Sequence, residues 1–466
     1  ENENPYKDIS CLKECIVISE GRSYVDIPQM MKALTKLSED GNKMKDSKDV
    51  WKAKVDSMIE MLKIELYTYM PWCDMIDELT EAFEKSEADI KEAFHGIIRK
   101  LNSDYSLKAM PVVYRETIKQ IEKLRKKLKD GQQKKIEGRD RLKEALEGAA
   151  ESADKLVKRY VDLINRICRI ADETEFVHLY DKKKQLFSIG YNIEENSLTN
   201  SYYDLLASEA RQTSYIAIAR GEVDQQHWFK LGRTLTQIDR YKGMVSWSGT
   251  MFEYFMPLLI MKSHKNTLLD ETYSFVVRSQ KKYGKQRNLP WGISESGFYS
   301  FDINLDYQYK AFGVPWLGLK RGLVEDMVVS PYATMLVLPL VPRDAMDNLK
   351  RLIAEGAYGH YGMYEAIDYT PERIPLGEKK GIVKSYMAHH QGMSILALNN
   401  YFNDNIMQKR FHADPVVDAA KLLLMEKVPS NIVFTKENKE KILPFKDVVY
   451  DEKDFLRECG MPDPVL

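Results

Sequence analysis

The first third of the chain is the part whose fold is most constrained, because its apolar residues recur at helical spacing. From residue 28 to about residue 171 they follow one another at intervals of three and four, as in Met58, Met61, Leu62 and Leu66. Charged residues of both signs lie between them, which is typical of solvated helix faces. Turn residues divide the segment into several helices, the longest running from about residue 134 to 170. We therefore expect helices whose apolar faces pack on one another.

The rest of the chain alternates helical patterns with long connections. A β-hairpin is expected first, with strands at 176–180 and 185–189, as an isolated strand pair in a helical chain. The connections are rich in glycine and aromatic residues, whereas a simple helix bundle has short polar loops. This pattern predicts a mainly α fold, a toroid of paired helices with the site on one rim. The helices are expected at 202–219, 225–231, 250–261, 269–283, 331–340, 343–355, 385–401 and 415–426.

Length and charge exclude some classes of protein. A chain of 466 residues with 44% hydrophobic residues exceeds the usual size of one core. We expect an N-terminal helical region over 1–131 and a catalytic domain over 132–466. The 69 Lys and Arg nearly balance the 70 Asp and Glu, and no basic tract is interleaved with aromatic residues. A nucleic-acid partner is therefore not expected, and a neutral substrate fits better.

Cysteine usage and hydropathy indicate the cellular environment of the chain. The five cysteines are scattered without a Cys-x-x-Cys pair, which favours a reducing compartment and gives no zinc pattern. No stretch approaches the roughly 20 apolar residues that span a bilayer. The chain starts at Glu1 rather than at methionine, which favours a processed chain or a segment of a longer protein.

Glu295 is the carboxylate with the most suggestive surroundings. It lies between Ser294 and Ser296, in a glycine-flexed segment, 289–299, that aromatic rings bracket. Pro290 and the glycines disfavour a helix or a central strand, so we expect Glu295 on a shaped loop. Such a carboxylate is typical of a sugar-cleaving site. A loop glutamate that only caps a helix is the alternative interpretation.

Aromatic residues and further carboxylates accompany Glu295. A pyranose ring stacks on aromatic faces, and four of the six tryptophans fall between residues 228 and 316, although such rings also fill cores. Glycoside cleavage needs one carboxyl group that carries a proton and a second that forms a sugar ester or activates water. On the expected helix 202–219, Glu209 points away from the face of Asp204 and Arg211, so Glu209 enters the lumen while Arg211 pairs locally.

The segment 389–391 combines two histidines and a glutamine. Adjacent histidines point to different sides of a helix and do not match the spacing of a helical metal site, so no metal is expected. They could bind sugar hydroxyls or orient a carboxylate, and a buried, hydrogen-bonded histidine is the alternative. Phosphate-binding glycine loops are absent from the sequence, and no cofactor is expected.

Six motifs together resemble one family. They lie at 202–211, 246–254, 291–296, 307–315, 364–371 and 387–393, and they resemble the glucoamylase-like central domain of bacterial cyclic β-1,2-glucan synthases. The resemblance extends over about 176–428. It implies an (α/α)6 barrel that transfers a linear β-1,2-glucan chain onto its own end to close a ring. It also implies, as partners, the other domains of a larger membrane-bound synthase, and a cytoplasmic location without direct membrane contact by this segment.

The resemblance further implies site residues. Glu209 would be the acid/base and Glu295 the nucleophile of a retaining route, with Glu253 and Glu365 as competitors for proton transfer. An inverting endo-β-1,2-glucanase and a non-catalytic glucan-binding module remain alternatives. The residues expected to bind glucosyl units are Tyr203, Asp204, Trp247, Glu253, Trp291, Tyr309, Tyr364, Glu365, Asp368, Tyr369, His389, His390 and Gln391.

Overall fold

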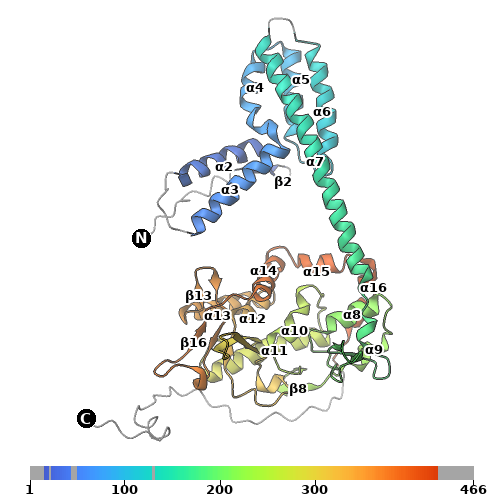
Figure 1. Cartoon of the computed structure of the whole chain (residues 1–466), viewed down its shortest axis with the longest axis vertical. Coiled ribbons are helices and arrows are strands. Elements are labelled where there is room, and N and C mark those ends of the chain that lie inside the picture. Colours follow the sequence, from blue (N-terminus) through green and yellow to red (C-terminus); the bar gives the residue numbers. More distant parts are fainter. Residues whose placement is uncertain (1–14, 20–21, 43–49, 129–131, 429–466) are drawn as a thin grey trace, which may run out of the picture. The chain divides into compact units, whose positions relative to one another are not determined.

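The chain folds into two compact units. The computed structural model describes residues 15–19, 22–42, 50–128 and 132–428 (Figure 1). Contacts between residues separate Glu1–Thr174 from Glu175–Leu466. The expected boundary at residue 131 differs from this division, because helix α7 (Gln133–Glu173) belongs to the first unit. The reason is its packing, since Leu142 and Leu146 of α7 are buried in the core of that unit.

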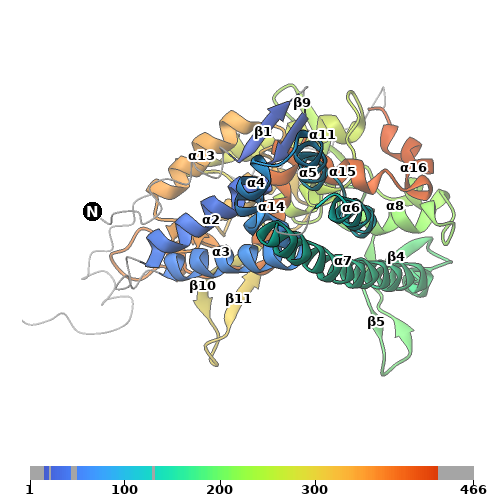
Figure 2. The same ribbon diagram turned by 90° about the horizontal axis from the view of Figure 1, so that it is seen from above.

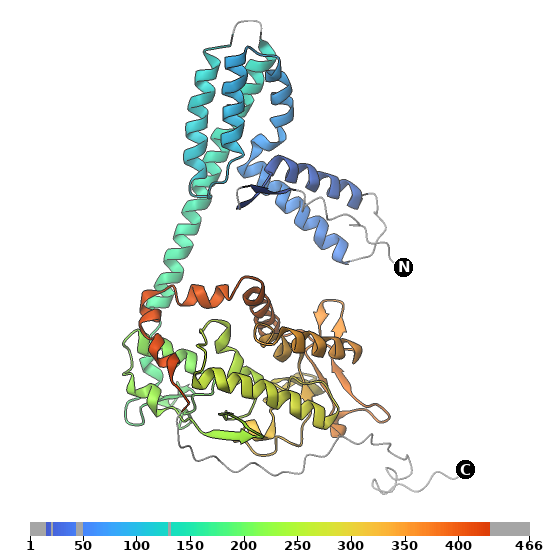
Figure 3. The same ribbon diagram turned by 180° about the vertical axis from the view of Figure 1, so that it is seen from behind.

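The first unit is helical, as its periodicity predicts. Helices α4 to α7 lie side by side (Figures 1 and 3), and the rings of Phe83 and Phe94 stack in their core with centroids 4.4 Å apart. The long helix expected over 134–170 is confirmed as α7. The other elements are the strands β1 (Ile16–Ser19) and β2 (Arg22–Val25), and the helices α2 (Ile27–Asn42), α3 (Val50–Tyr69), η1 (Pro71–Asp74), α4 (Ile76–Glu84), α5 (Ala88–Leu101) and α6 (Met110–Arg125).

The second unit combines helices with small antiparallel sheets. Its α-helices are α8 (Arg211–Ala219), α9 (Gln226–Lys230), α10 (Met251–Phe255), α11 (Leu268–Arg287), α12 (Pro331–Leu336), α13 (Pro342–Ala354), α14 (Ala388–Phe402), α15 (Ile406–Phe411) and α16 (Pro415–Ala419). Short 3-10 helices are η2 (Val177–Leu179), η3 (Pro257–Leu259), η4 (Pro315–Leu317), η5 (Pro371–Arg373) and η6 (Lys421–Met425). A continuous apolar core joins the helices, and Phe255, Tyr283 and Val329 are completely buried in it.

The strands of this unit are short. Figure 2 shows the hairpin of β10 and β11 projecting from the second unit, and β12, β15 and β16 form a three-stranded sheet in that order. The strands are β3 (Tyr180–Asp181), β4 (Leu186–Ser188), β5 (Tyr191–Asn192), β6 (Ser197–Leu198), β7 (Tyr202–Tyr203), β8 (Leu235–Ile238), β9 (Tyr241–Met244), β10 (Ser296–Phe301), β11 (Tyr307–Lys310), β12 (Val328–Val329), β13 (Tyr358–Gly359), β14 (Gly362–Met363), β15 (Ala366–Asp368) and β16 (Gly381–Val383).

The comparison with expectation is mixed. The mainly α class is confirmed. The predicted hairpin is confirmed in part: Tyr180 pairs with Phe187, but most of the expected first strand, 177–179, forms the 3-10 helix η2. Its isolation is wrong, because β7 adds a third strand and other small sheets follow. The helix expected over 202–219 is wrong in its first half, since Tyr202 and Tyr203 pair with β4 and α8 starts only at Arg211. The (α/α)6 barrel stays a prediction. None of the described helices is long and apolar enough to cross a membrane.

Candidate active site

A tightly held loop presents Glu295 between α11 and β10. Gly292 has φ of 121°, and a Cβ atom there would lie 3.0 Å from Oγ1 of Thr334, so only glycine fits without strain. The next residue, Ile293, exchanges two hydrogen bonds of 2.9 Å with the side-chain amide of Gln280. The prediction of a loop for Glu295 is confirmed, because the residue lies directly before β10. Helices α11 and α12 thus fix its backbone.

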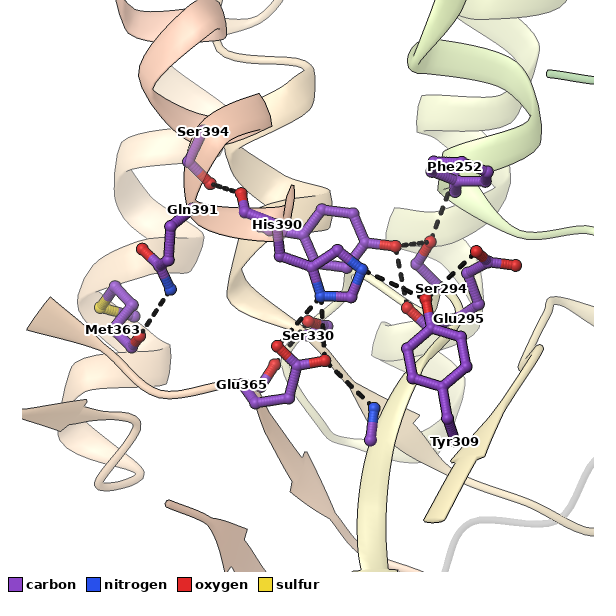
Figure 4. A network of polar contacts seen from close by, with 12 residues as sticks. Phe252, Ser294, Glu295, Tyr309, Ser330, Met363, Glu365, His390, Gln391 and Ser394 are labelled. Atoms are coloured by element: carbon purple, nitrogen blue, oxygen red, sulfur yellow. Dashed lines mark hydrogen bonds and ion pairs between the residues drawn. The ribbon is translucent and has the colours of Figure 1, made fainter. Parts of the chain in front are cut away.

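Two tyrosines then hold Glu295 itself, and Figure 4 shows one of them, Tyr309, beside its carboxylate. The Tyr332 hydroxyl donates to its backbone carbonyl at 2.8 Å, and the Tyr309 hydroxyl donates to its carboxylate Oε1 at 3.1 Å. The side chain is half-buried. Burial raises the pKa of Glu295 to about 7, and the negative charges of Glu209 and Glu253 add to this, while the Tyr309 hydrogen bond lowers it. Glu295 is therefore a positioned carboxyl group that titrates near neutral pH.

Glu209 approaches Glu295 from a different segment. It lies in the turn between β7 and α8 rather than on a helix, so its predicted direction relative to Arg211 is wrong. The hydroxyl of Ser208 donates to its Oε2 at 3.1 Å. Arg211 is buried and donates at 2.9 Å both to the Ser208 carbonyl and to the carbonyl of Glu253. Arg211 therefore connects the Glu209 turn to α10 instead of only pairing locally.

Tyr203 lies beside both carboxylates. Burial raises the pKa of its phenol, and the charges of Glu209 and Glu295 contribute to the same shift. These two carboxylates also interact with each other. The charges of the two residues predicted as the catalytic pair therefore act on each other, and both act on the half-buried Tyr203.

Glu253 faces the protein interior. It is 8% exposed and closes a capping box with Thr250 at the start of α10. Its carboxylate accepts hydrogen bonds from the Ser246 hydroxyl at 2.7 Å and from the backbone N–H of Ser248 at 3.0 Å. Burial raises its pKa, and these hydrogen bonds oppose the rise. The carboxylate is thus engaged in holding the loop that carries Trp247, whose ring is 59% exposed.

Replacing Glu253 by Gln is expected to lower the free energy of unfolding by about 2–3 kcal/mol, because the amide nitrogen would face hydrogen-bond donors. Denaturation in urea, followed by tryptophan fluorescence, measures the loss. The matched control is Glu194→Gln, since Glu194 is exposed on the surface. Equal midpoints for the two variants would contradict the structural role of Glu253.

Glu365 and His390 form a second buried pair. They are 2% and 1% exposed, and Nδ1 of His390 lies 2.9 Å from Oε1 of Glu365. The same carboxylate oxygen accepts the backbone N–H of Gly297 at 3.1 Å. The imidazole stacks on Tyr332 with ring centroids 3.7 Å apart, and its Nε2 lies 3.3 Å from the Tyr309 hydroxyl. This network leads from α14 to Glu295 through Tyr309 (Figure 4).

Asp368 is completely buried and ion-paired. Arg373 donates to it from Nε at 2.7 Å, and the backbone N–H groups of Tyr299 and Thr370 donate at 3.1 and 2.9 Å. Arg373 also binds Asp326. These bonds join β15 to the β10 hairpin. Asp368 therefore supports the backbone around the site rather than facing a ligand.

The remaining predicted residues differ in exposure. Trp291 and Tyr369 are each 6% exposed and belong to the core, so they lie behind the site surface. Asp204, Tyr309 and His389 are exposed, and Tyr364 and Gln391 are half-buried. Tyr332 was not among the predicted residues, although it holds Glu295, because a tyrosine in an expected helix gives no sequence pattern. Among the residues that the structure describes, no group of three His, Cys, Asp or Glu side chains is arranged to hold a metal ion.

Comparison with known proteins agrees with the motifs. Residues 201–415 match the glycoamylase family model, described as a putative glucoamylase. The chain is 46% identical over 285 residues, 61% of its length, to the cyclic β-(1,2)-glucan synthase NdvB of Rhizobium meliloti (strain 1021). It spans about a tenth of the length of that relative, since the aligned part is 10% of it. The predicted resemblance is confirmed: residues 201–415 match a glucoamylase family model, and the chain is similar to a segment of a cyclic β-(1,2)-glucan synthase.

Proposed function

We propose that the second unit is a retaining β-1,2-glucan transglycosylase, with Glu295 as nucleophile and Glu209 as acid/base. The observation that carries the proposal is that these two half-buried carboxyl groups interact electrostatically, each with one oxygen held by a neighbouring hydroxyl. Burial and the negative charge of Glu209 raise the pKa of Glu295. A retaining pair needs two carboxyl groups, one that attacks the sugar and one that transfers the proton.

The reaction follows from the positions of the oxygens. Tyr309 holds Oε1 of Glu295, so Oε2 attacks the anomeric carbon while Glu209 gives its proton to the departing 2-oxygen of the glucan. A sugar ester forms on Glu295. Glu209, now ionised, removes the proton from the 2-hydroxyl of an incoming glucan end, whose oxygen attacks the anomeric carbon and releases Glu295. The product is a ring or a chain of altered length.

Substrate contacts belong to the accessible side chains. The exposed ring of Trp247 offers a stacking face for a glucosyl unit, and Tyr203 lies at the carboxylate pair. His389 is exposed and Tyr364 and Gln391 are half-buried, and within the proposal their polar groups bind sugar hydroxyls. Within the proposal the helices follow the (α/α)6 arrangement of similar domains. The unit acts as a cytoplasmic part of a larger membrane-bound synthase, whose other domains supply the linear glucan.

Product analysis tests the proposal. Linear β-1,2-glucan of a single length is incubated with the protein, chain lengths are followed by mass spectrometry, and the anomer of new reducing ends is followed by NMR. Redistributed chains or rings with retained β configuration are expected. Hydrolysis alone with inverted configuration would establish the endo-glucanase instead, and binding without any product would establish a glucan-binding module.

The acid limb of the pH profile of kcat/KM is expected near pH 7. The nucleophile must be ionised, and the pKa of Glu295 is raised from 4.5 to about 7, so kcat/KM falls as pH decreases below about 7. Initial rates on linear β-1,2-glucan between pH 4 and 9 measure this limb. A limb near pH 4 to 5 would contradict the proposed environment of Glu295.

A further inference from the structure

The Tyr309 hydroxyl has two polar neighbours but only one hydrogen. It lies 3.1 Å from Oε1 of Glu295 and 3.3 Å from Nε2 of His390. Tyr309 stands on β11 at the accessible side of the site, whereas His390 is buried. The hydroxyl can therefore donate to one of these acceptors at a time.

Glu365 determines which form of the neutral imidazole is present. An ionised carboxylate only accepts hydrogen bonds, so Nδ1 of His390, at 2.9 and 3.0 Å from its two oxygens, must carry a hydrogen. In the neutral ring Nε2 then has a free lone pair that faces Tyr309. The parallel stack on Tyr332, with an interplanar angle of 9°, keeps the ring in this orientation.

We propose that Tyr309 is a two-position donor: it donates to Glu295 while this residue is a carboxylate and to His390 while it is a sugar ester. Glu365 and His390 are then positioning residues that act through Tyr309. This inference rests on the proposed function, because it needs an ester on Glu295.

The chemistry of the ester gives the reason for the exchange. When Oε2 bonds to the anomeric carbon, the bond from that carbon to the departing oxygen breaks and Glu209 protonates this oxygen. Oε1 becomes the ester carbonyl oxygen and loses most of its negative charge. It is then a weaker acceptor than an imidazole nitrogen. When the ester is cleaved, the electron pair returns to the carboxylate and the hydroxyl returns to Oε1. His390 therefore stabilises the ester and lengthens its lifetime.

The lifetime of the ester provides the first test. In a Glu209→Ala background, a 2,4-dinitrophenyl β-glycoside of a β-1,2-linked glucose oligomer loads the enzyme, and intact mass spectrometry follows the decay of the adduct. The combined change His390→Phe and Glu365→Gln keeps the stacked ring and leaves no unpaired buried carboxylate. It is expected to shorten the half-life about 5-fold, the effect of one hydrogen bond. The comparison is then repeated in proteins that also carry Tyr309→Phe. There the combined change is expected to alter the half-life less than about 2-fold. An equal effect in both backgrounds overturns the proposal.

A titration of Glu295 provides a second test that needs no turnover. The protein with Glu209 intact is labelled with ¹³C at the glutamate carboxyl carbons, and the Glu295 signal is assigned by its loss in Glu295→Gln. Tyr309→Phe is expected to raise the pKa of Glu295, because a hydrogen bond that lowers it disappears. The combined change at His390 and Glu365 is expected not to raise it, because it removes a competing acceptor. A rise in the pKa of Glu295 would mean that His390 donates to Tyr309, which overturns the proposal.

Several other ionisable groups surround Glu295 and His390. Those near Glu295 are Tyr203, Glu209, Glu253, Tyr309 and Tyr332, and those near His390 are Glu365, His389, Tyr309 and Tyr332.

Two further variants serve as a control and as a substitute for the combined variant. Ser394→Ala removes a 2.8 Å hydrogen bond to the backbone carbonyl of His390 without touching the ring, and it is expected to leave half-life and titration unchanged. If the combined variant does not fold, Glu365→Gln alone is used, because without the carboxylate the hydrogen of the neutral His390 ring is no longer fixed on Nδ1. This variant is expected to shorten the half-life of the ester only when Tyr309 is present. No change in that variant overturns the proposal. Absence of any adduct in Glu209→Ala would instead reject the covalent function, while the titration would still decide whether the three residues are coupled.

Discussion

Replacing Glu295 by Gln is expected to abolish chain transfer, with kcat/KM on linear β-1,2-glucan reduced on the order of 10⁴-fold or more. A neutral amide cannot form the sugar ester, and two other predicted carboxylates are not placed to substitute for it. Glu253 and Glu365 are buried and bonded within the protein. Product formation over long incubations at high enzyme concentration measures the residual rate. A rate within about 10-fold of the unchanged protein would remove Glu295 from the nucleophile role.

The same variant is expected to be more stable than the unchanged protein above pH 7. The pKa of Glu295 is about 7 in the folded state and near 4.5 in the unfolded chain, so the folded state binds more protons between these values. Glu295 therefore makes its full contribution to the free energy of unfolding below pH 4.5, and this contribution is lost as pH rises through 7. Glu295→Gln should gain about 1–3 kcal/mol at pH 8, once solvent screening of a half-exposed group is allowed for. Thermal unfolding at pH 5 and pH 8 distinguishes this from a folding defect, with Glu194→Gln as control.

The sequence allowed prediction of what depends on local conformation. Pro290 and Gly292 disfavour a regular element directly before Glu295, so its loop position could be recognised without a structure, although β10 begins at the next residue. The helix α7 followed from its periodicity in the same way. For Glu209 the local pattern failed, because Tyr202 and Tyr203 pair with β4, and pairing with a strand outside the segment overrides a helical pattern.

The supporting contacts could not be predicted, because they join residues far apart in sequence. Arg211 binds the carbonyl of Glu253, and Tyr332 binds that of Glu295, across separations of 42 and 37 residues. Likewise, Arg373 forms an ion pair with Asp368. The sequence alone favoured sugar binding for Asp368, because of its residue type and its neighbours. Residue type identifies candidate side chains, but only their burial distinguishes those that face a ligand from those that hold the loops.

Replacing Glu209 by Ala is expected to separate acid catalysis from nucleophilic attack. The rate on linear β-1,2-glucan should fall on the order of 10³-fold, because the departing sugar oxygen no longer receives a proton. The first step with a 2,4-dinitrophenyl β-glycoside should be nearly unaffected, since dinitrophenolate leaves without a proton.

Azide identifies the residue that supplies this proton. It needs no general base, so it should restore turnover in Glu209→Ala by attacking the ester on Glu295 and should give a β-glycosyl azide. Glu253 and Glu365 are the competing candidates, and the same change at either is expected to give no azide product, because their carboxylates accept hydrogen bonds inside the protein. An azide adduct from one of those variants, and none from Glu209→Ala, would transfer the acid/base role away from Glu209. An α-glycosyl azide would mean a single displacement without the ester, and the inverting glucanase would then be the correct mechanism.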